Sequence, residues 1–435
     1  MKILAKTTLI AIGMVLAVTT TKAQSGTNSP YSQFGFGELT GEQSGFNRAM
    51  NGLGIAFNDG SQVNYINPAS YAKTDSLTFL FDAGLSLQLT NFSENGRRRN
   101  ANNANFDYVT MAFRAAKHLG MSIGVVPITK IGYNYSQVSN IGDIQDAMQY
   151  SASYTGSGGL RQVYIGAGWE PLRNLSIGTN IGYLWGDYTH TLVNAYSDNT
   201  VNALSKTHTA DISSYKIDFG LQYATKLSKK NTLTIGATYG IGHKLNADAR
   251  CEVTSINSAT QVTNTTTDTI KNAISIPTTF GAGIMWNHNN RLQFGIDYTM
   301  QQWSKESFPV YDANKQTQKF YSDKNYFDNR HKITIGGEYC RNKIARNFFQ
   351  RIRYRAGFGY ATSYVNIAGK NGPKEISATI GFGIPIVNGY NSRSVLNISG
   401  GWVRQEAKGM LTENTYRIGI GITFNERWFQ KWKFD

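Results

Sequence analysis

Large apolar residues alternate with small or polar residues along most of this chain. In the clearest stretch, from Leu292 to Gln301, every second residue is large and apolar, and its neighbours are Gln, Gly, Asp and Thr. A period of two places the apolar residues on one face of an extended strand. The pattern predicts fourteen β-strands, at approximately 77–91, 105–116, 119–135, 161–170, 173–188, 212–226, 231–243, 274–287, 291–303, 331–340, 351–362, 375–385, 394–404 and 415–424.

The connections between these segments alternate in length. The tight turns are 170–173, 227–230 and 287–290, and the long polar stretches are 136–160, 189–211, 244–271 and 304–330. Short periplasmic turns and long extracellular loops are typical of outer-membrane β-barrels, in which closure leaves no unpaired sheet edge in lipid. A soluble secreted β-sandwich is the alternative, but its strands are usually shorter, about 5–6 residues. We predict an all-β, 14-stranded antiparallel transmembrane β-barrel at 76–425 with a short C-terminal tail at 426–435.

The residues before the first strand form two further segments. A basic start, an apolar core at 9–18 and a small-residue cleavage site at 21–23 predict a secretory signal peptide at 1–23. An anchor helix is the alternative, but the apolar stretch is too short for one. Residues 24–75 lack strand alternation and hold too many apolar and aromatic residues for a disordered leader. We predict that they fold inside the barrel as an N-terminal plug, or hatch.

Composition excludes several classes of function. Only 16% of the 435 residues are charged, and no apolar run reaches the roughly 18 residues of a membrane-spanning helix. Two cysteines are too few for a disulfide scaffold or a Cys-based metal cluster. The six histidines have no metal-ligand spacing and no Gly-x-Ser-x-Gly elbow occurs, so we expect no enzyme activity, no metal and no cofactor. The net charge is +15, but no tract interleaves basic and aromatic residues, so we expect no nucleic-acid partner.

A short motif, Asn67, Pro68 and Ala69, stands at the end of the predicted hatch and just before the first strand. At this place, ahead of fourteen strands, it resembles the hatch of FadL-type outer-membrane transporters of long-chain fatty acids and other hydrophobic compounds. The resemblance covers essentially the whole mature chain. It extends to the Bacteroidetes branch of that family, through the sequences at 28–32, 47–50 and 64–71.

The resemblance implies passive uptake of hydrophobic molecules by a monomeric barrel in the cell outer membrane, with its N-terminus on the periplasmic side. Substrate would enter a lumenal pocket and leave sideways through a gap in the wall. The same branch contains PorV-like proteins, which implies an alternative function. In that case the barrel transports nothing and is a partner in protein secretion or outer-membrane assembly. The expected partners are therefore fatty acids or similar small molecules and membrane lipid, or a periplasmic or secretion-complex protein.

Pro127 lies near the middle of the third predicted strand and is our candidate for a lateral gate. Proline has no N–H for the ladder and is confined to edges, strand starts or bulges. The sequence therefore predicts a local break in pairing, and the resemblance implies a lateral opening there. We expect Asn67, Pro68 and Ala69 of the hatch to lie beside this break.

Lys216 and Arg417 are our candidates for binding a ligand carboxylate. Both fall on the inward, polar phase of predicted strands. A cation in a low-dielectric interior is costly unless it is paired, so each must be matched by an acid or be available to an anionic ligand. A further group of basic residues, between Arg341 and Arg355, surrounds a predicted periplasmic turn, where it suits anionic headgroups or an acidic partner.

Overall fold

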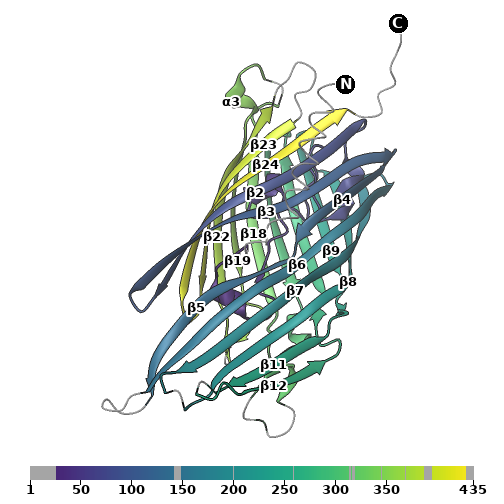
Figure 1. Cartoon of the computed structure of the whole chain (residues 1–435). Coiled ribbons are helices and arrows are strands. Elements are labelled where there is room, and N and C mark those ends of the chain that lie inside the picture. The colour runs from purple at the N-terminus through teal and green to yellow at the C-terminus, as the bar shows by residue number, and fades with distance from the viewer. Residues whose placement is uncertain are drawn as a thin grey trace, which may run out of the picture.

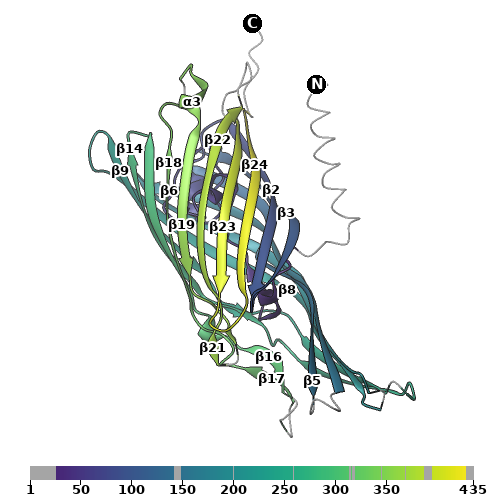
Figure 2. The ribbon, with the colours of Figure 1, turned by 90° about the vertical axis from the view of Figure 1, so that its left-hand side faces the viewer.

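The molecule is a closed β-barrel around a folded N-terminal segment (Figures 1 and 2). The computed structural model describes residues 26–141, 148–198, 200–257, 259–312, 315, 319–343, 345–367, 369–386 and 394–427. In these residues the wall has fourteen antiparallel strands, with β4 and β5 counted as two halves of one strand. The sheet closes because the first wall strand pairs with the last, from Thr78 opposite Arg427 to Ser93 opposite Thr412.

The wall strands are β2 (Thr78–Glu94), β3 (Arg97–Ala116), β4 (Leu119–Pro127), β5 (Thr129–Ile141), β6 (Met148–Leu172), β7 (Leu175–Tyr196), β8 (Ala203–Lys226), β9 (Asn231–Gly240), β14 (Thr279–His288), β15 (Leu292–Gln301), β18 (Arg330–Tyr339), β19 (Arg353–Ala361), β22 (Lys374–Ile386), β23 (Ser394–Glu406) and β24 (Thr412–Arg427). The fold class predicted from the sequence is confirmed.

The two ends of the barrel differ in their connections. Tight turns follow β3, β6, β8 and β14 at one end, which we call the short-turn end and which is uppermost in Figure 1. The connection from β18 to β19 at this end contains the helix α3 (Phe348–Arg351). The opposite, long-loop end carries β10 (His243–Lys244), β11 (Ala249–Ile256), β12 (Thr263–Ile270), β13 (Ser275–Ile276), η3 (Trp303–Lys305), β16 (Phe308–Tyr311), β17 (Phe320–Asp323), β20 (Asn366–Ile367) and β21 (Lys370–Asn371).

Several wall strands are longer than the hydrophobic pattern predicts. Most of the described residues in the predicted loops 136–160 and 189–211 belong to β5, β6, β7 and β8, and β11 and β12 form a hairpin beside β8 within the predicted loop 244–271. β6 has 25 residues, or about 80 Å at 3.3 Å per residue, whereas an apolar band is about 25 Å tall. Beyond lipid, outward positions need not be apolar, so backbone pairing continues after the alternation ends.

The outer face of the wall is apolar. Exposed residues such as Leu87, Ile165, Ile181 and Ile420 alternate with buried neighbours along their strands. Among the described residues no helix is long and apolar enough to span a membrane. The exposed apolar side chains cover the wall strands, as contact with lipid requires.

The N-terminal residues 26–77, which we call the hatch, run inside the barrel. Their elements are η1 (Pro30–Gln33), β1 (Glu38–Leu39), α2 (Gly45–Arg48) and η2 (Pro68–Lys73). The centre of the hatch has its own apolar cluster, in which the rings of Phe46 and Phe57 lie 4.6 Å apart, with Met285 of the wall against them. Towards the long-loop end, Phe36 packs on Trp303 and Phe308 of the loops. The hatch therefore contacts both the wall and the loops.

Candidate functional site

The hatch motif starts η2 and binds the hatch to the wall. Asn67 is fully buried, and its Oδ1 accepts a hydrogen bond from the Ala69 N–H at 3.1 Å. Its Nδ2 donates to the carbonyl oxygens of Ile55 at 2.7 Å and of Leu221 in β8 at 3.1 Å. Pro68 occupies the first turn of the helix, where its missing N–H has no intrahelical partner to lose. The motif thus caps a helix and joins two parts of the hatch to β8.

Glycines in the wall admit the hatch backbone near this motif. A Cβ at Gly168 of β6 would lie 2.5 Å from the carbonyl oxygen of Pro68, and one at Gly178 of β7 would lie 2.4 Å from its carbonyl carbon. Contacts this close are not made by real Cβ atoms, so the backbone can approach only where the wall has glycine. The small residues of the alternating pattern therefore face the hatch.

Charged side chains hold the centre of the hatch in the barrel. The Oδ2 atom of Asp297 in β15 accepts from the backbone N–H groups of Gly54 at 2.7 Å and Ile55 at 2.8 Å. Arg48 of α2 donates to Asp107 of β3 at 2.6 Å, and both side chains are buried. Removing one partner of a buried ion pair strongly destabilises the fold, because the other charge is left buried without a partner. These contacts explain how a glycine-rich segment keeps one position.

Asp59 makes a third charged contact, at the short-turn end. Its carboxylate lies 3.2 Å from Nζ of Lys343 and 3.1 Å from Nη1 of Arg353. Burial alone would raise the pKa of Asp59, but Lys343, Arg353 and hydrogen bonds from Ser61 outweigh it and hold this pKa well below its ordinary value. The carboxylate is therefore ionised at every physiological pH.

The wall is interrupted at Pro127. β4 pairs with β3 only as far as Val125, which lies opposite Val109. On its other side Pro127 still pairs with Arg161 of β6. After the proline, β5 pairs with β6 and with β1, and in the described residues it has no pairing with β3. The ladder is thus broken between β3 and β5, which separate toward the long-loop end in Figure 1.

The first part of the hatch covers this break. Glu38 and Leu39 extend the sheet by pairing with the first two residues of β5. The hydroxyl of Thr40 donates to the carbonyl oxygen of Pro127 at 2.6 Å. On the opposite side, Asn28 donates to a side chain of β3 at 3.0 Å. Residues 28–40 therefore fill the space that an unbroken ladder would occupy.

One expectation about the hatch motif is wrong. The sequence suggested that Asn67, Pro68 and Ala69 lie beside Pro127, but they contact β6, β7 and β8 near the short-turn end instead. The reason is steric, because the wall glycines that admit the backbone of η2 lie there. The hatch residues beside Pro127 are Glu38, Leu39 and Thr40, which no sequence motif marks.

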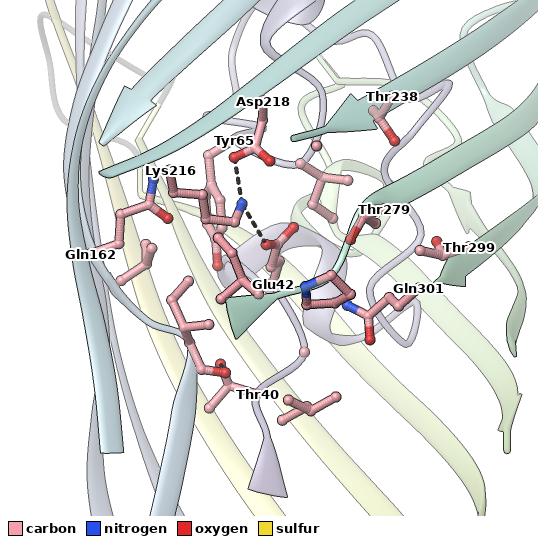
Figure 3. Close-up of a pocket in the computed structure, with 18 of the residues that line it drawn as sticks. Thr40, Glu42, Tyr65, Gln162, Lys216, Asp218, Thr238, Thr279, Thr299 and Gln301 are labelled. Carbon is pink, nitrogen blue, oxygen red and sulfur yellow. Dashed lines mark hydrogen bonds and ion pairs between the residues drawn. The ribbon is translucent and has the colours of Figure 1, made fainter. Parts of the chain in front are cut away.

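A lumenal cavity of about 170 Å³, which we call cavity one, lies next to the break (Figure 3). Val126 and Ile128, on either side of Pro127, belong to its lining. The same cavity is lined by hatch residues Leu39–Glu42. Its apolar side is formed by Phe36, Leu39, Val126, Ile128, Leu160, Leu184 and Trp303. An apolar ligand placed there would contact the hatch and the broken strand together.

Lys216 lines cavity one but its charge is matched. It forms an ion pair with Asp218, two residues along β8, and a second with Glu42 of the hatch at 3.6 Å (Figure 3). Asp218 could have been found in the sequence, since residues two apart on a strand share a face. Glu42 gave no signal because its contact depends on how the hatch folds. Lys216 is therefore part of a closed charge cluster.

Arg417 lies in a second cavity of about 110 Å³, cavity two, which shares Leu39, Thr40 and Gly41 with cavity one. Its guanidinium donates to Gln88 at 3.1 Å, whereas its buried Nε has no partner, and no carboxylate forms an ion pair with it in the part of the chain that is described. The cations lining cavity two outnumber its acids: Arg48, Lys130, Arg330, Lys332 and Arg417 against Glu38, Asp107 and Glu375.

Two of the three acids of cavity two already have ion-pair partners. Asp107 binds Arg48 and also lies 3.8 Å from Lys130, and Glu375 lies 3.5 Å from Arg330. Structure therefore separates the two candidates for carboxylate binding. Among the described residues, Lys216 has two carboxylates in ion-pair contact and Arg417 has none.

These features define a closed, fourteen-stranded antiparallel β-barrel with a folded hatch inside it. The fold is similar to that of CymD, a monoaromatic hydrocarbon channel, with 15% sequence identity and a TM-score of 0.56, over 92% of this chain and 99% of that one. The toluene transporter TbuX of Ralstonia pickettii gives 15% and 0.58 over 89% and 99%. A FadL homologue of Pseudomonas aeruginosa gives 11% and 0.56 over 89% and 98%.

Family assignment comes from the sequence as a whole. The chain belongs to the BamG family, whose model matches residues 4–435. No curated protein sequence matches it significantly.

Proposed function

We propose that the protein is a channel of the outer membrane for the passive uptake of hydrophobic molecules, which leave the lumen sideways at the Pro127 break. One observation carries this proposal. Leu39 and Thr40 line cavity one and also cover the break, so movement of one short segment would connect the cavity to the lipid. The names of the similar solved structures, which are hydrocarbon and toluene channels and a FadL homologue, support the same class of substrate.

The size of cavity one suggests how ligands are accommodated. An engineered cavity of about 150 Å³ in another protein holds benzene, so the roughly 170 Å³ of cavity one suits a ligand of monoaromatic size. A long-chain fatty acid needs more room, since drug-sized pockets measure about 300–1,000 Å³. Such a ligand would have to displace Leu39–Glu42. This structure then represents the closed conformation, in which Leu39 and Thr40 cover the break.

For a ligand with a carboxylate, we assign Arg417 as the anchor. Its buried Nε has no hydrogen-bond partner among the described residues, and cavity two has more cations than acids. Because the cavities share Leu39, Thr40 and Gly41, a carboxylate beside Arg417 would place its alkyl chain toward cavity one. Lys216 would not serve, as its two carboxylate partners already compete for it.

The proposed orientation follows from the connections. Short turns are periplasmic and long loops extracellular in barrels of this kind. The short-turn end would therefore face the periplasm, together with the N-terminal side of the chain. A single closed wall accounts for uptake without a second subunit, so we propose a monomer.

A second function, partnership in protein secretion or outer-membrane assembly by a PorV-like barrel, is favoured by the number of contacts that hold the hatch. Asp107 and Asp297 of the wall bind Arg48 and Gly54 of the hatch, and Asp59 of the hatch binds Lys343 and Arg353. A barrel that never opens needs such contacts more than a channel does.

Native mass spectrometry of the detergent-purified full chain distinguishes the two functions. Uptake predicts a reproducible aliphatic or aromatic molecule bound to the barrel, which added dodecanoate or toluene displaces. An empty barrel that retains protein partners and binds neither compound would reject uptake and support the second function.

A further inference from the structure

A connection at the short-turn end combines positive charge with exposed aromatic rings. We call it the basic aromatic turn, and it comprises the described residues 341–343 and 345–351 between β18 and β19. It includes four basic residues, and residues 341–351 contain no acid. The helix α3 in this turn projects past the upper rim of the wall in both views of the ribbon (Figures 1 and 2).

Three of its four charges have no ion-pair partner in the part of the chain that the structure describes. Lys343 binds Asp59 of the hatch. Arg341, Arg346 and Arg351 form no ion pair with any of the residues that the structure describes, and Nε of Arg351 is buried without a partner. The guanidinium of Arg351 lies 6.0 Å from the ring centre of Phe348. A surface of this kind attracts an anion.

The aromatic part of the turn continues the lipid-facing wall. Phe348 and Phe349 are 42% and 70% exposed, with their ring centres 5.8 Å apart. The hydroxyl of Tyr354 donates to the carbonyl oxygen of Phe349 at 3.3 Å. Tyr354 and Tyr339 face each other across β18 and β19 on the outer surface. The exposed phenylalanines therefore stand next to the aromatic rim at which a barrel meets the headgroups.

We propose that the basic aromatic turn binds anionic phospholipid headgroups in the leaflet at the short-turn end. Arg341, Arg346 and Arg351 contact the phosphates, and Phe348 and Phe349 enter the boundary between headgroups and acyl chains. Basic residues near a membrane are attracted by its anionic lipids, and aromatic residues insert at this depth. An acidic protein would also match the positive charge. It would not explain why the two phenylalanines are exposed next to Tyr354, which faces outward.

The test compares lipid binding by two triple variants of the full chain in nanodiscs. One carries Arg341→Ser, Arg346→Ser and Arg351→Ser. The matched control removes the same charge from exposed arginines at the long-loop end, with the substitutions Arg97→Ser, Arg98→Ser and Arg99→Ser. Native mass spectrometry after release counts the phosphatidylglycerol and phosphatidylcholine molecules that each barrel retains.

The turn variant should lose phosphatidylglycerol affinity by about fivefold per arginine, the effect of one basic residue near an anionic surface. Phosphatidylcholine retention should be unchanged, and the control should stay near the wild type. Equal losses in both variants, or no loss in either, would overturn the proposal. Unchanged lipid retention with loss of an acidic co-purifying protein would also overturn it and make the turn a protein-docking surface.

Two further variants keep the proposal testable. If the triple variant does not fold, Arg346→Ser alone is used, because this side chain is exposed and makes no ion pair in the described part of the chain. Phe348→Ser with Phe349→Ser should lower the retention of both lipids, since insertion does not depend on headgroup charge. Full retention of both lipids by this double variant would exclude insertion of the rings.

Discussion

Arg417 and Lys216 are both cations inside the lumen, but in the described part of the chain only Lys216 has carboxylates in ion-pair contact with it. We predict that Arg417→Gln weakens dodecanoate binding about tenfold, the scale of a charged hydrogen bond of about 1.5–3 kcal/mol. Dodecane binding should change little, because it has no carboxylate to lose. Titration calorimetry with both ligands measures the ratio of the two affinities.

The control for this prediction is a double variant that leaves the net charge of the lumen unchanged. Lys216→Gln combined with Asp218→Asn removes one cation and one acid from cavity one. It should change dodecanoate and dodecane binding by the same factor. Selective loss of dodecanoate in this double variant, with Arg417→Gln unaffected, would reverse the assignment.

Asp59 allows a second prediction at the scale of single residues. Arg353 is buried and also lies 3.7 Å from Glu338, whereas Lys343 is 41% exposed. Arg353→Gln should therefore destabilise hatch docking by about 3–5 kcal/mol, the cost of breaking a buried pair. Lys343→Gln should cost only about 0.2–1 kcal/mol. Hydrogen exchange of the hatch peptide around Asp59 measures both effects, and equal effects would contradict the ranking.

The pH dependence of hatch docking follows from the depressed pKa of Asp59. A carboxylate with a folded-state pKa below its ordinary value of about 3.9 contributes stability that is fully present above that value. The contribution disappears only as the pH falls through the lower, folded-state pKa. Hydrogen exchange of the hatch peptide around Asp59 in the wild type should therefore show no loss of the Asp59 ion pairs between about pH 5 and pH 8.

At the scale of elements, the glycine-lined faces of β6 and β7 set the position of η2. Gly178→Ala would put a Cβ 2.4 Å from Pro68, so η2 must shift, at a cost of about 1–3 kcal/mol for overpacking. Gly400→Ala is the control, because nothing lies within 4 Å of its added Cβ. Protease should cleave the hatch faster in the first variant only. Equal cleavage would mean that the close contact does not hold η2.

Strands could be predicted from the sequence where one face contacts lipid. Beyond the lipid the alternation of apolar and polar residues ends, so the pattern does not reveal strands there. The segment from Leu292 to Gln301 coincides with β15 because its outward residues must be apolar. The parts of β6 and β8 near the long-loop end were not predicted, because polar side chains occur on both of their faces where both contact water. Pro127 predicted the break in the ladder, since the loss of an N–H is a property of one residue.

At the scale of the whole molecule, the lumen depends on contacts between residues far apart in the chain. Lys216 and Arg417 were found from the inward phase of their strands. Glu42, Asp107 and the hatch residues at the break were not, because no local pattern reveals which side of the hatch faces which strand. The charges that distinguish Lys216 from Arg417 therefore required the folded barrel.

The central claim is that ligands leave between β3 and β5, so the most direct measurement closes that space. Asn105 and Lys130 flank Gly26 across the break, and Cys251 and Cys340 are buried and free and can be replaced by Ser. Asn105→Cys with Lys130→Cys, joined by a cleavable bismaleimide, should abolish transfer of a fluorescent fatty acid into proteoliposomes while binding persists.

The control joins β3 to β4 at a position that is already paired, with Ala112→Cys and Ser122→Cys. This cross-link should leave transfer unchanged, and cleavage of the first linker should restore it. Transfer at the wild-type rate with Asn105→Cys and Lys130→Cys fully cross-linked would contradict lateral exit.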